Sequence, residues 1–210
     1  MFVYINTMDD QKRYALFSQA AYRMNSPLKS KQTRMQDAMS VVNEGGITGF
    51  EMDREQSGSK RAVFVNKKTK EVVIAHRGTD PKLASNLSTD FAVALGLEGM
   101  TRRFSNAAER DAATQDKYQG YKVSLTGHSL GATIATHSSK NNNMKAYLFN
   151  AGSGLLNPSH YIRPKKQSRN ITHYSTAADP LSLTAKLKPH KQVIVSRKSG
   201  ENPHSLANFL

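Results

Sequence analysis

Hydrophobic and polar positions along this chain follow two periods, one typical of helices and one of strands. Apolar residues recur at helical spacing over residues 10–25, and Pro27 follows that segment. Helices are also expected at 106–118, with Asn106 as the N-cap, and at 130–139. Short runs rich in β-branched residues predict strands at Ile47–Met52, Arg61–Val65, Glu71–Ala75, Tyr121–Thr126, 144–149, Ile171–Ala178 and Lys191–Ser196.

The order of these elements indicates the fold class. The strand at 121–126, the helix at 130–139 and the strand at 144–149 form a β-α-β unit, which implies parallel strands and a right-handed crossover. A length of 210 residues is enough for one full core, and there is no repeat, low-complexity tract or linker. We therefore expect one compact α/β domain over residues 1–210, with a mostly parallel central sheet flanked by helices.

Composition excludes several classes of protein. No stretch approaches the ~18 apolar residues that a membrane-spanning helix needs, and the apolar start Met1–Asn6 is too short for a signal peptide. The absence of cysteine excludes a disulfide framework, a thiolate nucleophile and a cysteine zinc site. The mean hydropathy of -0.58 predicts a soluble chain, compatible with the cytoplasm.

The formal net charge of +14 is unevenly distributed. Residues 118–210 hold 12 basic residues and only two acidic ones, Asp179 and Glu201. A positive field attracts anionic partners. The cations are spread over several segments with few aromatic residues between them, which favours an anionic membrane over nucleic acid. A basic face that is simply solvated explains the same charge equally well.

The motif with the clearest chemistry is Gly127-His128-Ser129-Leu130-Gly131. It reads G-x-S-x-G between a predicted strand and a predicted helix, the setting of a nucleophile elbow. The glycines Gly127 and Gly131 leave room for the tight turn. The turn directs the backbone N–H of Leu130 toward the space in front of Ser129, where an oxyanion would form.

A serine nucleophile needs an acid and a base. Asp179 closes a predicted strand directly before Pro180, where a loop-borne catalytic acid is expected, and Glu201 is the alternative. His204 follows the last strand and lies on the same sheet edge, whereas His190 enters that strand from the opposite end. An ordinary histidine ahead of a short helix at 205–209 is the competing interpretation of His204.

No other histidine has metal-ligand spacing, so no metal or organic cofactor is expected. The predicted strand at 71–75 runs into His76-Arg77-Gly78-Thr79, and the second oxyanion donor of this elbow arrangement comes from such a loop. Thr79 can offer its backbone N–H there.

With these motifs the chain resembles the class 3, or fungal-type, lipases of the α/β-hydrolase superfamily. The resemblance spans roughly residues 10–209 and rests on 76–79, 127–131, Asn150-Ala151-Gly152-Ser153, Asp179-Pro180-Leu181 and His204-Ser205-Leu206. It implies an α/β-hydrolase fold, a Ser129, His204, Asp179 triad, and oxyanion donors on Thr79 and Leu130. His76 and Ala132 depart from the family pattern, as does the chain end six residues after His204.

By the same resemblance, the apolar segment 86–100 occupies the position of a lid, and a short helix packed on the core is the alternative. The resulting hypothesis is a serine carboxyl-ester hydrolase that acts on lipid esters. The competing hypothesis is a lipase-shaped protein without catalysis, which contacts membrane or nucleic acid within a larger assembly such as a virus particle.

Overall fold

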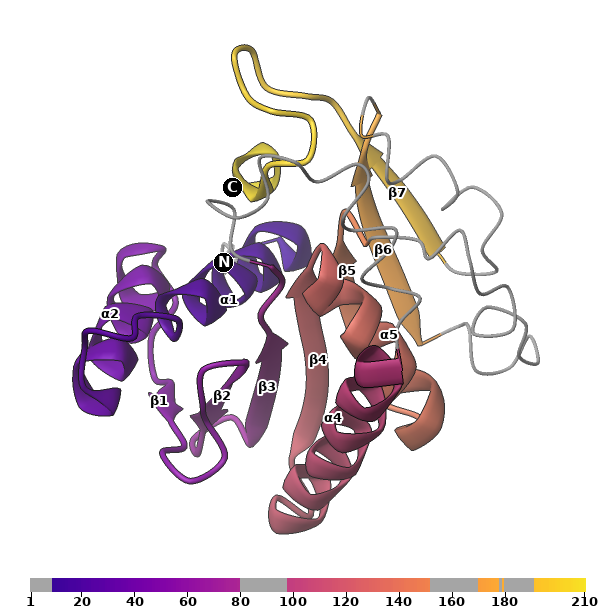
Figure 1. The fold of residues 1–210 in the computed structure, drawn as a ribbon. Coiled ribbons are helices and arrows are strands. Elements are labelled where there is room, and N and C mark those ends of the chain that lie inside the picture. Colours follow the sequence, from indigo (N-terminus) through magenta and orange to yellow (C-terminus); the bar gives the residue numbers. More distant parts are fainter. Residues whose placement is uncertain (1–8, 80–97, 152–169, 178, 180–190) are drawn as a thin grey trace, which may run out of the picture.

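A seven-stranded sheet organises the computed structural model, which describes residues 9–79, 98–151, 170–177, 179 and 191–210. The strand order along the sheet follows the chain. β1 to β3 pair antiparallel, and β3 to β7 pair parallel (Figure 1). The strands are β1 (Glu51–Met52), β2 (Arg61–Asn66), β3 (Glu71–His76), β4 (Lys122–His128), β5 (Lys145–Phe149), β6 (Ile171–Thr176) and β7 (Lys191–Val195). This confirms the mostly parallel α/β sheet expected from the sequence.

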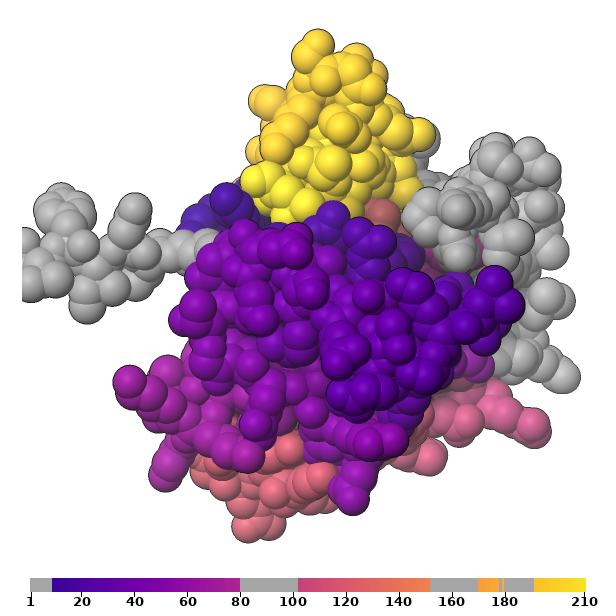
Figure 2. All heavy atoms as spheres, turned by 90° about the vertical axis from the view of Figure 1, so that its left-hand side faces the viewer, coloured from indigo at the N-terminus to yellow at the C-terminus, as the bar shows by residue number. Residues whose placement is uncertain are grey.

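Helices cover both faces of the sheet. They are α1 (Asp10–Arg23), α2 (Lys31–Glu44), α4 (Glu98–Lys117), α5 (Leu130–Asn142) and the short 3-10 helix η4 (Leu206–Phe209). Side chains of β2 and β3 alternate between two cores, because successive residues of a strand point to opposite faces. Phe64 and Val73 pack with α1, α2 and η4, whereas Val63 and Ile74 pack with α5. Figure 2 shows α1 and α2 covering their face, with the C-terminal residues (yellow) above them.

One helix of the structure was not expected from the sequence. α2 carries only three buried residues, Met35, Ala38 and Val42, on an otherwise polar surface, so its periodicity is weak. Its start is nevertheless marked by Ser30, whose hydroxyl accepts a hydrogen bond from the backbone N–H of Thr33 at 3.1 Å. Packing against α1 stabilises this helix.

Two predicted boundaries are wrong. The predicted strand at 47–52 is reduced to Glu51–Met52. The helix expected to begin at the cap Asn106 begins at Glu98, and Asn106 is an exposed interior residue. The cost of asparagine inside a helix is under about 1 kcal/mol. Packing of α4 on α5, which includes a ring contact between Phe104 and His137, extends the helix through it.

The carboxyl ends of β3 to β6 meet at one edge of the sheet, because these strands are parallel. The segments that follow them carry the residues singled out above. No helix in the described ranges is both long and apolar enough to cross a membrane. Most of the expected lid at 86–100, as well as His160, His190 and the basic segments at 163–169 and 186–190, lie outside the described residues.

Candidate active site

Ser129 lies on a sharp turn between β4 and α5. Its backbone has φ 57° and ψ −125°, a conformation that is strained for a residue with a side chain. A Cβ on Gly127 would lie 2.5 Å from the carbonyl oxygen of Gly131, and one on Gly131 would collide with the carbonyl of His76. Both glycines are therefore required by close backbone approach. The Ser129 N–H donates to the Phe149 carbonyl at 3.0 Å, which fixes the turn to the end of β5.

The loop after β3 packs directly against this turn. Gly78 is buried, and a Cβ there would lie 2.7 Å from the carbonyl oxygen of His128, the residue before Ser129. Thr79 follows and is half-buried. Leu130 is the first residue of α5 and is buried, and the first N–H groups of a helix have no partner within the helix. The structure thus brings the loop of Thr79 to the elbow that carries Ser129 and Leu130.

Asp179 and His204 are brought together at the same edge. Nδ1 of His204 donates to Oδ2 of Asp179 at 3.2 Å. The Asp179 side chain is completely buried, and that of His204 is 18% exposed. With the proton on Nδ1, the lone pair of the neutral imidazole is on Nε2.

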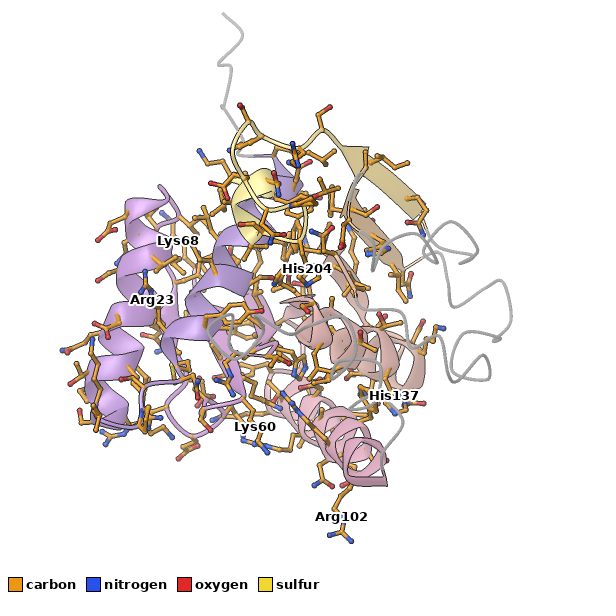
Figure 3. The ribbon with its side chains drawn as sticks, turned by 45° about the horizontal axis from the view of Figure 1, so that its top comes forward. Arg23, Lys60, Lys68, Arg102, His137 and His204 are labelled. Atoms are coloured by element: carbon orange, nitrogen blue, oxygen red, sulfur yellow. The ribbon has the colours of Figure 1, made fainter. Side chains whose placement is uncertain are left out.

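The Nε2 atom of His204 is buried and has no hydrogen-bond partner among the described residues. Ser129 Oγ is therefore not hydrogen-bonded to it here. Separations in an unliganded hydrolase are commonly longer than in its substrate complex. His204 is nevertheless adjacent to the elbow, because its ring centroid lies 4.9 Å from that of His128. Figure 3 shows the His204 side chain in the interior of this edge of the molecule.

A second buried histidine lies at the same edge of the sheet. His173 is buried in β6, and its Nε2 accepts a hydrogen bond from the Ala151 N–H at 3.0 Å. That contact holds the segment after β5 to the neighbouring strand. His173 thus acts in the packing of the sheet edge.

The side chain of Asn150, at the end of β5, links the two loops that carry Asp179 and His204. Its Oδ1 accepts from the Thr176 N–H at 2.9 Å, and its Nδ2 donates to the Pro203 carbonyl at 3.1 Å. Asn150 itself has φ 41°. The sequence analysis quoted this residue within a motif but assigned it no role. Its position directly after a predicted strand was the available signal.

A buried ionic cluster supports β3 where the oxyanion loop begins. His76 Nε2 contacts Asp111 Oδ2 at 2.7 Å, and Arg61 donates to Asp111 Oδ1 at 2.8 Å. Burial raises the pKa of Asp111, but the adjacent His76 and Arg61 outweigh burial and hold that pKa below its ordinary value. Sequence reasoning noted His76 only as a departure from a family pattern. Its partners are 15 and 35 positions away, so no local signal identified them.

The described part of the chain contains no group of three or more histidine, aspartate or glutamate side chains arranged to hold a metal ion. The His204–Asp179 contact is that of an imidazole oriented by a carboxylate, with its other nitrogen available to take a proton.

Comparison with known proteins places the chain in a family. A family model described as a Tle-like phospholipase domain, of phospholipase-like type, matches residues 13–202. No curated protein sequence shows a significant match to the chain.

Solved structures of fungal lipases share the fold. Lipase II from Rhizopus niveus is similar with a TM-score of 0.59 at 15% identity, over 92% of this chain and 81% of that chain. A lipase from Rhizopus microsporus var. chinensis has a TM-score of 0.51 at 15% identity, over 92% and 75%. A lipase from Yarrowia lipolytica has a TM-score of 0.50 at 13% identity, over 96% of this chain and 84% of that chain.

The likeness to these lipases confirms the predicted fold, which is the α/β-hydrolase fold of the fungal-type lipases. Fold and family together support a lipid ester hydrolase. The family model covers nearly the whole chain. This chain belongs to the phospholipase-like family with a Tle-like phospholipase domain.

Proposed function

We propose that this protein is a serine hydrolase of lipid esters, with phospholipids as its substrate class. The observation that carries the proposal is the His204–Asp179 hydrogen bond, which leaves the buried Nε2 of His204 without a described partner beside the Ser129 elbow. The phospholipase-like family and the net charge of +14 support a phospholipid at an anionic surface over a neutral lipid.

In the proposed reaction Ser129 Oγ attacks the ester carbonyl carbon, and His204 Nε2 takes the hydroxyl proton. The backbone N–H groups of Leu130 and Thr79 stabilise the oxyanion of the tetrahedral intermediate. When this intermediate collapses, the ester C–O bond breaks and His204 delivers the proton to the leaving alcohol. Water then attacks the acyl carbon as His204 takes its proton. His204 returns this proton to Ser129 Oγ as the acyl–oxygen bond breaks and the carboxylic acid leaves. Asp179 keeps the proton on Nδ1 and stabilises the imidazolium at both stages.

A fluorophosphonate probe together with a hydrolysis panel tests the proposal. We expect rapid covalent labelling of the wild-type protein and none of Ser129→Ala, because only an activated serine hydroxyl reacts fast. p-Nitrophenyl esters and phospholipid vesicles then define the substrate. Equal, slow labelling of both proteins, with no hydrolysis above that of Ser129→Ala, would contradict the proposal and favour the non-catalytic, lipase-shaped binding protein.

The proposed membrane partner is tested separately. Binding to vesicles should increase with the fraction of anionic lipid and decrease with added salt, because salt screens the positive charge of the protein. Binding that is independent of salt and equal on neutral vesicles would indicate an apolar anchor, for which Phe91, Val93 and Leu95 of the expected lid would be the residues to change.

A further inference from the structure

His128, the variable residue of the G-x-S-x-G motif, connects three parts of the site through a buried imidazole. Its Nε2 lies 2.7 Å from the backbone carbonyl oxygen of His204, and its Nδ1 lies 2.9 Å from the Tyr22 hydroxyl on α1. Tyr22 lies 106 positions before His128, and His204 lies 76 positions after it. The contacts bring α1, the elbow and the loop of the base together.

The two partners of His128 determine its tautomer. A carbonyl oxygen only accepts hydrogen bonds, so Nε2 carries the proton and donates it to His204. In the neutral ring Nδ1 then accepts from the Tyr22 hydroxyl. Burial, and next the nearby His204, lower the pKa of His128 to about 3, with Asp179 opposing this. The ring is therefore neutral at physiological pH.

Tyr22 also contacts the proposed oxyanion loop. Gly78 has so little space that an added Cβ would collide with the Tyr22 hydroxyl oxygen. One hydroxyl group thus touches the loop that carries Thr79 and fixes the imidazole that follows Gly127. The hydroxyl therefore lies beside both the oxyanion loop and the elbow, where these two segments pack directly on each other.

The other carbonyls around the base are held by different side chains. Asn150 donates to the Pro203 carbonyl, and Asn208 Nδ2 donates to the Asn202 and Ser205 carbonyls at 2.9 and 3.0 Å. Among the described side chains, His128 is the one that donates to the carbonyl of His204 itself. Loss of that bond removes the donor from the His204 carbonyl, while the His204 N–H stays hydrogen-bonded to Asn202 Oδ1 at 2.8 Å.

We propose that His128 is a positioning residue for the base: its Nε2–H holds the His204 backbone carbonyl, and the Tyr22 hydroxyl holds the ring itself through Nδ1. This inference rests on the proposed function of Ser129 and His204. A neutral His128 also serves the reaction, because a charged ring at this distance would oppose protonation of His204.

Two substitutions of similar polarity separate the donor from the rest of the ring. In His128→Gln the side-chain amide reaches the position of Nε2 and can still donate to His204, whereas in His128→Asn it reaches only the position of Nδ1. We expect His128→Asn to lower kcat for a soluble p-nitrophenyl ester by about 100-fold with little change in KM, since a misplaced base slows the chemical step more than binding. His128→Gln should stay within about 10-fold of the wild type.

His137→Asn is the matched control. His137 is a half-buried histidine about two turns into α5, where its ring contacts Phe104. Figure 3 shows its side chain away from that of His204. The His137→Asn variant should keep a near-normal kcat for the same ester. Equal losses in the asparagine and glutamine variants of His128, or an equal loss in the control, would overturn the inference.

NMR of the imidazole nitrogens tests the inference by a measurement that does not depend on ester hydrolysis. His128 should remain neutral and protonated on Nε2 between about pH 5 and 8, and Tyr22→Phe should leave the proton on Nε2, because the His204 carbonyl still needs a donor. The signal of the His204 Nδ1 proton should survive in His128→Gln and weaken in His128→Asn. If the wild-type protein hydrolyses no ester, the proposed function fails and these signals decide the inference alone. A charged His128, or a His204 signal unchanged in His128→Asn, would refute it.

Discussion

The described residues include two histidine–aspartate pairs, and these differ in the nitrogen that each imidazole uses. His76 contacts Asp111 through Nε2 at 2.7 Å, and His204 contacts Asp179 through Nδ1 at 3.2 Å. Both aspartates are completely buried. The His76 side chain is 3% exposed, compared with 18% for His204.

The surroundings of the two pairs explain their roles. Arg61 balances the charge of Asp111, so the first pair joins β2, β3 and α4 into a fixed ionic cluster. In the second pair the orienting carboxylate binds one nitrogen, and the other has no partner among the described residues. A histidine–aspartate contact alone does not mark a site suited to proton transfer. The nitrogen that the imidazole uses and the counter-charge beside the carboxylate distinguish such a site from a structural one.

The same substitution at both histidines gives the largest expected contrast. His204→Gln should lower kcat/KM for a p-nitrophenyl ester by about 10⁶-fold, because glutamine cannot accept the serine proton, and Ser129→Ala should match it. The double variant should be little worse than either single one, since the residues act as a unit. His76→Gln should cost less than about 10-fold in the same assay, because it acts only through packing. Comparable losses of kcat/KM at both histidines would show that the two pairs do not differ in role.

Asp179→Asn tests the orienting carboxylate. Asparagine keeps the shape but favours the wrong imidazole tautomer, so we expect kcat to decrease by about 10⁴-fold. Fluorophosphonate labelling of Ser129 should slow in parallel. A variant that retains most of its activity would point to Glu201, the alternative acid of the sequence analysis.

Asp111→Asn should affect stability more than catalysis. It leaves Arg61 buried without its counter-charge, which costs about 3 kcal/mol in the free energy of unfolding, measured by urea titration. Because the pKa of Asp111 is lowered in the folded protein, its carboxylate stabilises the fold above its unfolded pKa of about 3.9, and this stabilisation is lost at lower pH. The difference between wild type and variant should therefore shrink below about pH 4. A constant difference would show that the charge is not responsible.

Thr79→Ala should have the smallest effect. The proposed oxyanion donor is the backbone N–H, which alanine retains, so kcat should decrease by no more than about 10-fold. Steady-state kinetics on the same ester would measure it. A loss as large as that of Asp179→Asn would assign the main stabilisation of the oxyanion to the threonine hydroxyl.

Local patterns were sufficient to predict most elements of the fold. β2 and β3 follow the positions of their β-branched runs, and α1 ends shortly before Pro27 as expected. α2 was missed because few of its residues are apolar, and the start of α4 was misplaced because Asn106 is a common cap that packing on α5 overrides. These errors arise where tertiary contacts outweigh local preference.

Spacing and residue type are enough to predict most strands and helices, the Ser129 elbow and a short choice of acids and bases, because these features are expressed locally. Only the tertiary structure decided which side chains meet: Asp179 with His204, Asn150 with Pro203, and Tyr22 with His128. The physical reason is that parallel strands gather their carboxyl ends at one edge whatever their separation along the chain. The tautomer and neutrality of a histidine then depend on partners that no local pattern reveals.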